Sequence, residues 1–289
     1  MIKFKHSTSI FTLLLSLYLF ITSCNIINAD ETIPSYIYIQ PFTFTTDLET
    51  QGFASSKITD GWVYLNDNPI GVFELPAQIP ILASGDNEIS ILPGIKENGI
   101  SGTAINYQFY QSYLVSINLE EKNIDTIYPT TNYIDDIDFE LLDRFELGNP
   151  FLATSESDAA VTTTLDANVF EGLRSGAVYM EQPDYFFRCV TDDAFYFSPG
   201  KTVYLELDYK CDINFEIHLR ANKIGFPLIT SYVLTITKKD DWNKIYVNLT
   251  PQIQFLDGDS YNLEIHAFLP SDQNNASLYF DNIKIIEQN

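Results

Sequence analysis

Apolar and polar residues alternate with period two along the second half of the chain, from residue 195 to residue 286. Turn residues bound each alternating run, and the clearest runs lie at residues 204–210, 215–220, 242–249, 261–268 and 278–286. This pattern predicts antiparallel strands with one buried face and one solvated face. Since the runs are short and show no helical periodicity, they indicate a β-sandwich.

The first half of the chain shows the same alternation in shorter runs. The expected strands lie at residues 36–40, 58–65, 70–75, 87–92, 105–109, 113–119 and 125–128. The sequence Asn66-Asp67-Asn68-Pro69 joins two of them and predicts a hairpin turn. Pro76, Pro80 and Pro93 favour short or edge strands here. Residues 35–133 therefore fit a small Ig-like or transthyretin-like β-sandwich, and the fold class is all-β with two sandwich domains.

The N-terminus has the pattern of an export signal. A basic start at Lys3 and Lys5 precedes an apolar run at residues 10–21, which has the length of a signal-peptide core rather than of a membrane span. The run ends in Ile21-Thr22-Ser23-Cys24, which resembles the bacterial lipobox. The resemblance implies cleavage before Cys24 and acylation of that cysteine, for example with palmitate. An ordinary secretory signal with an incidental cysteine is the alternative.

These observations predict four segments along the chain. They are a signal peptide at 1–23, a lipidated tether at 24–34, the first sandwich at 35–133, and a jelly-roll sandwich at 134–289. The acidic sequence Asn28-Ala29-Asp30-Glu31 resembles the signals that direct some Gram-negative lipoproteins to the surface of the outer membrane. It is also compatible with a plain acidic linker. We expect an outer-membrane, lipid-anchored protein that is exposed at the cell surface if this signal operates.

The composition limits the partners. The chain carries 39 acidic and 16 basic residues, for a formal net charge of −23. Such a surface repels nucleic acid and anionic lipid head groups. Membrane association would therefore need the covalent lipid anchor.

The second domain contains several short motifs in a recognisable order. Phe145-Glu146 near its start is followed by a turn at residues 172–176, a hairpin at Pro199-Gly200-Lys201 and a closing strand with Asp281-Asn282-Ile283. This order resembles the jelly rolls of carbohydrate-binding modules and covers nearly the whole domain. The resemblance implies glycan binding. It also implies a structural calcium ion at Glu146 and Asp281, whose oxygen ligands suit a hard cation; Asp281 could instead only start a turn. We expect no other cofactor to be required.

Residue parity along two strands predicts one polar surface. Phe215, Ile217 and Leu219 share one side of their strand, and Leu263, Ile265 and Ala267 share one side of theirs. The opposite sides carry the candidate glycan-binding residues Glu216, His218, Arg220, Glu264 and His266, followed by Phe268. Charged groups of this kind can hydrogen-bond sugar hydroxyls. A solvated polar face is the simpler interpretation, and His218 and His266 with a carboxylate could also hold a transition metal.

Aromatic residues supply further candidates. Trp242 and Tyr246 alternate with Ile245 and Val247, so we expect them to be exposed and to stack on sugar rings. A second aromatic group comprises Tyr107, Phe109, Tyr110 and Tyr113. Any of these rings could instead cover the interface between the two domains.

Cys189 and Cys211 are the remaining thiols. The turn at residues 198–201 would bring these positions near one another, and an oxidising compartment would permit a disulfide. Two buried free thiols are the alternative.

Catalytic motifs are scarce. Asp136-Ile137-Asp138-Phe139-Glu140 resembles the alternating carboxylates of some jelly-roll glycoside hydrolases, but Asp stands where the first Glu of that pattern belongs. The sequence shows no nucleophile elbow, zinc-protease motif or phosphate loop. The preferred interpretation is a non-catalytic envelope lipoprotein whose jelly roll binds glycan. The alternatives are an assembly lipoprotein that binds another envelope protein and, more remotely, a glycoside hydrolase.

Overall fold

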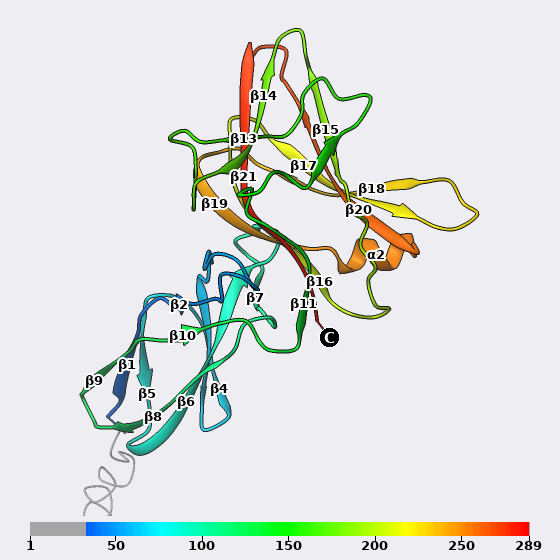
Figure 1. The fold of residues 1–289 in the computed structure, drawn as a ribbon. Helices are drawn as coiled ribbons and strands as arrows, with labels where there is room; N and C mark the ends of the chain where they lie inside the picture. The colour runs from blue at the N-terminus through cyan, green and yellow to red at the C-terminus, as the bar shows by residue number, and fades with distance from the viewer. Residues whose placement is uncertain (1–32, 289) are drawn as a thin grey trace, which may run out of the picture.

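The computed structural model describes residues 33–288, and its strands form two groups (Figure 1). Strands β1 to β10 pair with one another, and strands β11 to β21 pair with one another. A single isolated bridge between Glu97 and Tyr246 connects the groups within the described part of the chain. The predicted all-β class with two sandwiches is confirmed. The predicted signal peptide, Cys24 and most of the tether lie outside the described residues.

The first group contains ten strands: β1 (Ser35–Ile39), β2 (Thr43–Phe44), β3 (Asp60–Leu65), β4 (Asn68–Glu74), β5 (Ala77–Ile81), β6 (Gly85–Lys96), β7 (Ala104–Asn106), β8 (Tyr113–Leu119), β9 (Ile124–Ile127) and β10 (Thr130–Thr131). One sheet has the order β5-β1-β9, and a larger one runs β4-β3-β6 with β7 and β8 both paired to β6. Apolar residues such as Ile37, Ile79 and Ile91 fill the space between them. The predicted hairpin forms, with Asn66 and Asp67 at positive φ in its turn.

Two of the three prolines meet the expectation of short or edge strands: Pro76 lies between β4 and β5, and Pro80 lies in β5, whereas Pro93 lies inside the long β6. Pro69 and Pro80 belong to β4 and β5, which are edge strands, so the missing N–H removes no ladder bond from a sheet interior. Pro93 lies inside β6, between the residues that pair with β8 and those that pair with β7. Only the ladder on the β7 and β8 side is interrupted at Pro93; on the other side Pro93 lies opposite Gly61 of β3.

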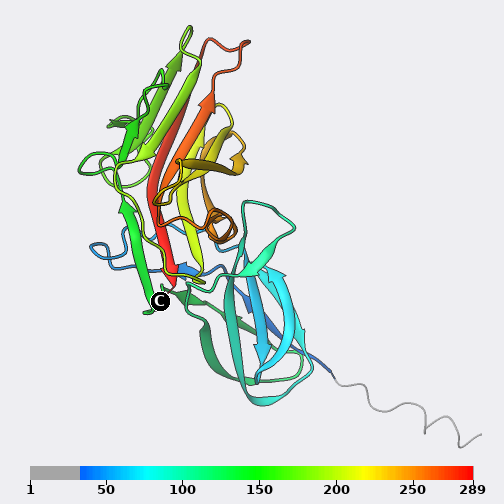
Figure 2. The ribbon, with the colours of Figure 1, turned by 90° about the vertical axis from the view of Figure 1, so that its right-hand side faces the viewer.

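The second group forms a jelly-roll sandwich (Figures 1 and 2). Its five-stranded sheet has the order β12 (Phe151–Ala153), β15 (Phe186–Thr191), β20 (Ser260–Phe268), β17 (Phe215–Asn222) and β18 (Ile229–Ile236). Its six-stranded sheet has the order β13 (Thr162–Thr164), β14 (Ser175–Glu181), β21 (Asn275–Gln288), β16 (Val203–Cys211) and β19 (Lys239–Asn248), with β11 (Ile137–Asp143) also paired to β21. The long β21 pairs with β14 along its first half and with β11 along its second.

Core side chains of both sheets follow the alternation seen in the sequence. Phe215, Ile217 and Leu219 of β17 are fully buried, and so are Leu205 and Leu207 of β16. One short helix, α2 (Thr250–Leu256), interrupts the strands, although the sequence showed no helical pattern. Among the described residues, none of the helices is long and apolar enough to cross a membrane.

The two cysteines do not form a disulfide. Both are buried free thiols, which corrects the disulfide interpretation. Cys189 lies on β15 of the five-stranded sheet, whereas Cys211 ends β16 of the six-stranded sheet. Burial raises the pKa of Cys211 to about 11, so the thiol stays protonated.

An aromatic cluster joins the two strand groups. Tyr107 of the first group contacts Tyr204 and Tyr246 of the jelly roll, with ring centroids 5.4 and 4.9 Å apart. Phe109 and Tyr110 also belong to this buried cluster. The interpretation that these rings cover the interface between the sandwiches is confirmed for Tyr107, Phe109 and Tyr110.

Candidate functional site

The outer side of the five-stranded sheet carries most of the predicted glycan-binding residues. Because β17 and β20 are neighbours, Glu216 lies opposite His266, and His218 lies opposite Glu264. The predicted meeting of these side chains on one sheet is confirmed. We call this surface the open face and define it by the outward residues of β15, β17, β18 and β20: Phe186, Arg188, Glu216, His218, Arg220, Thr230, Tyr232, Glu264, His266 and Phe268.

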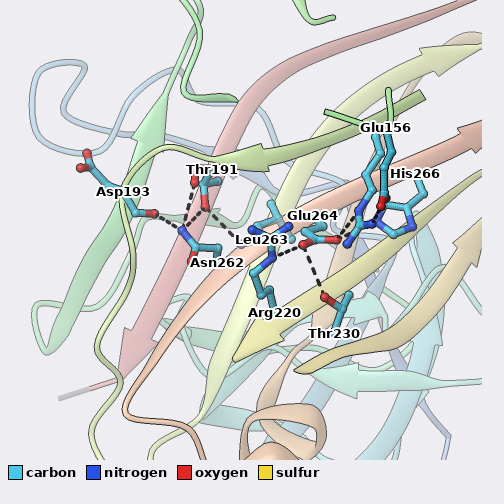
Figure 3. Close-up of polar contacts among 10 residues, drawn as sticks. Glu156, Thr191, Asp193, Arg220, Thr230, Asn262, Leu263, Glu264 and His266 are labelled. Atoms are coloured by element: carbon cyan, nitrogen blue, oxygen red, sulfur yellow. Dashed lines mark hydrogen bonds and ion pairs between the residues drawn. The ribbon is translucent and has the colours of Figure 1, made fainter. Parts of the chain in front are cut away.

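Glu264 lies at the centre of the open face and organises it (Figure 3). Its Oε2 accepts hydrogen bonds from Arg188 Nε at 3.0 Å and from His266 Nε2 at 2.7 Å. Its Oε1 forms an ion pair with Arg220. Burial alone would raise the pKa of Glu264, but the hydrogen bonds from His266 and Arg188 and the charge of Arg220 outweigh burial and lower it to about 2. The carboxylate is therefore ionised at neutral pH.

Glu264 is fully buried under these partners, which corrects its expected role. A buried carboxylate cannot contact a bound sugar directly. It instead fixes the positions of Arg188 and Arg220, each of which retains about a fifth of its side-chain exposure, 22%. Arg188 was not predicted, although the alternation Phe186-Phe187-Arg188-Cys189 places it outward, because no motif marked that strand.

The two histidines stack on each other, with ring centroids 4.0 Å apart and planes inclined by 19°. His218 Nε2 is 2.8 Å from Glu216 Oε2. Burial lowers the pKa of His218, the hydrogen bond to Glu216 opposes this effect, and the nearby His266 lowers the pKa further. His218 is therefore mostly neutral at pH 7, and its ring can both donate and accept a hydrogen bond.

Aromatic rings flank this polar centre. Phe186 and Phe268 stack at 4.8 Å, and Tyr232 meets His218 edge-on at 5.6 Å. Phe268 is 59% exposed and Tyr232 49% exposed, so both offer ring surface to a ligand. A depression of about 430 Å³ adjoins the open face, and Glu216, His266 and Phe268 are among the residues that line it. The open face thus combines fixed hydrogen-bonding groups with exposed aromatic surface.

Trp242 and Tyr246 are not part of this site, which corrects their assignment. Both lie on β19, in the other sheet. Tyr246 is only 1% exposed because the aromatic cluster covers it. Trp242 packs against Phe170 with ring centroids 5.0 Å apart. The parity of β19 was interpreted correctly, but the alternation could not show that another part of the chain covers that side.

A transition metal could use part of the open face. Among residues 33–288, Glu216, His218 and His266 form a group in which one ligand atom of each lies within 4.8 Å of the others. Two imidazoles and one carboxylate suit zinc or copper. Both Nε2 atoms already contact glutamates, so these bonds would have to yield or the Nδ1 atoms would have to serve.

The residues expected to hold calcium converge on one loop. Glu146 Oε1 accepts hydrogen bonds from the amides of Leu173 at 2.7 Å and Arg174 at 3.2 Å. Asp281 Oδ2 accepts from Ser175 Oγ at 2.7 Å and from the amide of Glu171 at 3.3 Å. Both carboxylates therefore tie the loop at 171–175 to the sandwich, as the expected ion would.

Part of this region still fits an oxygen-ligated cation. Asp281 is fully buried, and burial raises its pKa to about 7 even though it accepts hydrogen bonds. The Oδ1 atom of the adjacent Asn282 is buried and lacks a hydrogen-bond partner. Oxygen atoms in such a setting suit calcium, which would favour the ionised form of Asp281. Calcium at Glu146 and Asp281 stays a prediction.

The carboxylates of the hydrolase-like motif lie at the start of β11. Asp136 and Asp138 are exposed, and Glu140 is partly buried. Burial raises the pKa of Glu140, and the charges of Glu287 and Asp138 raise it further.

Comparisons with known proteins identify no family. No family model matches the sequence, and no curated protein matches it. Among solved structures, a family 11 carbohydrate-binding module from Clostridium thermocellum, in complex with a β-1,3-1,4-mixed-linked tetrasaccharide, is 16% identical, with 52% of this chain and 94% of that chain covered and a TM-score of 0.37. The C-terminal family 22 carbohydrate-binding module of Xyn10B from the same organism is 14% identical, with 51% and 92% covered and a TM-score of 0.36. At such low TM-scores, these similarities do not assign a ligand to this chain.

Proposed function

We propose that this chain is a non-catalytic glycan-binding protein of a bacterial cell envelope, and that the open face is its binding surface. The observation that carries the proposal is the buried Glu264, which holds Arg188, Arg220 and His266 in fixed positions beside exposed aromatic rings. Glu264 thereby preorganises hydrogen-bonding groups at the surface before any ligand binds.

The chemistry of the open face suits a sugar ring. Arg188, Arg220 and His218 supply donors to hydroxyl oxygens, and Glu216 supplies an acceptor to hydroxyl protons. Phe268 and Tyr232 offer apolar ring faces to the C–H groups of a pyranose. Because Glu264 orders the arginines before binding, less side-chain entropy is lost when the sugar binds. We propose that the adjoining depression receives a further sugar unit.

Titration of the purified protein against a glycan panel, by array and then calorimetry, tests this proposal. We expect His218→Ala and Phe268→Ala each to weaken binding at least tenfold without changing the far-ultraviolet circular dichroism. Phe255→Ala is the matched control, since Phe255 is a 78% exposed ring on α2. The proposal fails if the folded protein binds no glycan, or if Phe255→Ala weakens binding as much as Phe268→Ala.

We also propose that the protein is lipid-anchored at Cys24 in the outer membrane. The support is the lipobox-like sequence Ile21-Thr22-Ser23-Cys24 after an apolar run. Mass spectrometry of the protein from envelope fractions should find an acylated N-terminal Cys24, and Cys24→Ser should release the protein from the membrane. An unmodified mature N-terminus at any other residue would contradict this.

One observation favours the alternative, an assembly role with another envelope protein. The hairpin between β17 and β18 protrudes from the sandwich (Figure 1). It exposes Ile224, Phe226 and Leu228 by 85%, 63% and 63%. Water-exposed apolar groups gathered at a protruding tip are typical of protein interaction sites. If Phe226→Ser abolishes cross-linking to an envelope protein while glycan titrations stay negative, the assembly role replaces the glycan proposal.

A further inference from the structure

A second depression lies between the two strand groups, and Thr235 lines both it and the depression beside the open face. It has a volume of about 390 Å³. The first group contributes residues on and around the end of β6, and the jelly roll contributes β19 and the end of β18. We call it the junction pocket. Since both parts of the chain build it, neither part alone contains the site.

The junction pocket differs from the rest of the molecule in charge. Lys57, Lys96, Lys239 and Lys244 line it, and no aspartate or glutamate is among its lining residues. These are four of the 16 basic residues in a chain with 39 acidic ones. A strongly acidic protein repels anions at long range, so a region that concentrates positive charge is the place where an anion can bind.

Two of the four lysines are already neutralised. Lys96 Nζ lies 2.8 Å from Asp60 Oδ1. Lys244 Nζ lies 3.2 Å from Glu206 Oε2, and Asp208 is also close. Their charges balance buried carboxylates behind the pocket wall, so they contribute little to the field inside it.

Lys57 and Lys239 are different, because neither forms an ion pair with any residue of the described range 33–288. Lys57 Nζ donates to the side-chain oxygen of Asn243, which carries no charge. Burial lowers the pKa of Lys57, and the nearby charge of Lys239 lowers it further. Exposed Asp240 and Asp241 follow Lys239 in the chain, but neither lines the pocket. Lys57 and Lys239 thus line one pocket, and neither has an ion-pair partner among residues 33–288.

Neutral donors complete the lining. Asn98 and Ser101 come from the first group, and Thr237 and Asn243 come from the jelly roll. Hydroxyl and amide groups of this kind donate to oxyanions. We propose that the junction pocket binds an oxyanion, a carboxylate, sulfate or phosphate group carried by a small molecule or a glycan, between Lys57 and Lys239. The bound anion would connect the two sandwiches.

Calorimetric titration of the whole protein with sulfate, phosphate and glucuronate, at constant ionic strength in chloride, tests this inference. We expect at least one of the three to bind with one site per chain. Glucose serves as the neutral counterpart of glucuronate. We expect the double variant Lys57→Gln/Lys239→Gln to weaken anion binding at least tenfold.

Lys238→Gln is the matched control. Lys238 adjoins Lys239 in sequence and carries the same charge, but it lines the depression beside the open face instead. The inference is overturned if none of the three anions binds, or if Lys238→Gln weakens binding as much as the double variant. Binding of a neutral glycan at the open face should persist in the double variant, so failure here is distinguishable from failure of the glycan proposal.

Discussion

The two sheets of the jelly roll place charged residues on their outer sides, yet these sides have opposite surroundings. On the six-stranded sheet, the outward residues of β16, β19 and β21 form what we call the covered face: Glu206, Asp208, Lys244, Tyr246, Asp281 and Lys284. Each of these residues is at most 5% exposed. On the open face, only Glu264 is similarly buried at 0% exposure, and its partners reach solvent.

Around Glu206 and Lys284, the covered face is closed by tyrosines of the first strand group. Tyr107 and Tyr133 each donate a hydrogen bond to one oxygen of Glu206, both at 2.9 Å. Lys284 Nζ donates to Tyr133 Oη at 3.2 Å. This network neutralises and buries charge, so it serves to join the sandwiches. The comparison teaches that a polar sheet face becomes a binding surface or an internal interface depending on what packs against it.

Of the substitutions that distinguish the covered face from the open face, Glu206→Ala should lower the free energy of unfolding the most. It removes the partner of Lys244 and two tyrosine hydroxyls inside a closed interface, so the free energy of unfolding should fall by about 3–5 kcal/mol. Urea denaturation measures the change. A loss below about 1 kcal/mol would mean that water already enters this interface.

The pH dependence of stability should reveal Asp281 on the covered face. Burial raises the pKa of Asp281 to about 7, so the folded state binds more protons than the unfolded state between about pH 4 and pH 7. The free energy of unfolding should therefore fall as pH rises through this window, by roughly 3 kcal/mol. Asp281→Asn should flatten the slope, and exposed Asp240→Asn should not.

Calcium would reverse this dependence. A cation bound at Asp281 favours the ionised form, so stability would then rise with pH. Repeating the pH series with added calcium and with a chelator therefore tests the calcium prediction at Glu146 and Asp281. Identical curves under both conditions would argue against the ion.

Glu264→Gln should have a smaller effect on stability than Glu206→Ala. Arg188 and Arg220 lose their partner, but both can turn to solvent. The free energy of unfolding should therefore fall by about 2 kcal/mol. Glu216→Gln removes a partly exposed carboxylate and is the comparison; the free energy of unfolding should fall by less than about 1 kcal/mol. Glu264→Gln should still weaken glycan binding, because the arginines are no longer fixed. Unchanged affinity would show that Glu264 has only a structural role.

Replacing one tyrosine of each face by phenylalanine should give the smallest difference in the free energy of unfolding. Tyr133→Phe removes a buried hydroxyl that donates a hydrogen bond to Glu206, so the free energy of unfolding should fall by about 1–2 kcal/mol. Tyr232→Phe removes a hydroxyl whose bond to Thr235 Oγ1 is exposed, and should cost about 0.5 kcal/mol or less. Thermal denaturation of both variants makes the comparison. Equal losses would contradict the assignment of one face as covered and the other as open.

Much of the open face could be predicted from the sequence. The period of two is local, so residue parity on 215–220 and 261–268 correctly separated core from outward residues. The expected polar surface required these two strands to lie in one sheet; the structure makes them direct neighbours, which brings His218 beside Glu264. Arg188 was missed because its strand carries no motif, and its partnership with Glu264 depends on β15 being the other neighbour of β20.

The sequence by itself determined the all-β class, the parity of its main strands and the strongly acidic charge, because each follows from local order or composition. The tertiary structure alone decided that Tyr246 is buried, that Cys189 and Cys211 stay apart, and that Lys57 and Lys239 line one pocket. These outcomes depend on contacts between residues far apart in the chain. Alternation specifies which side of a strand faces outward, but only the packing of distant segments specifies whether water or protein lies there.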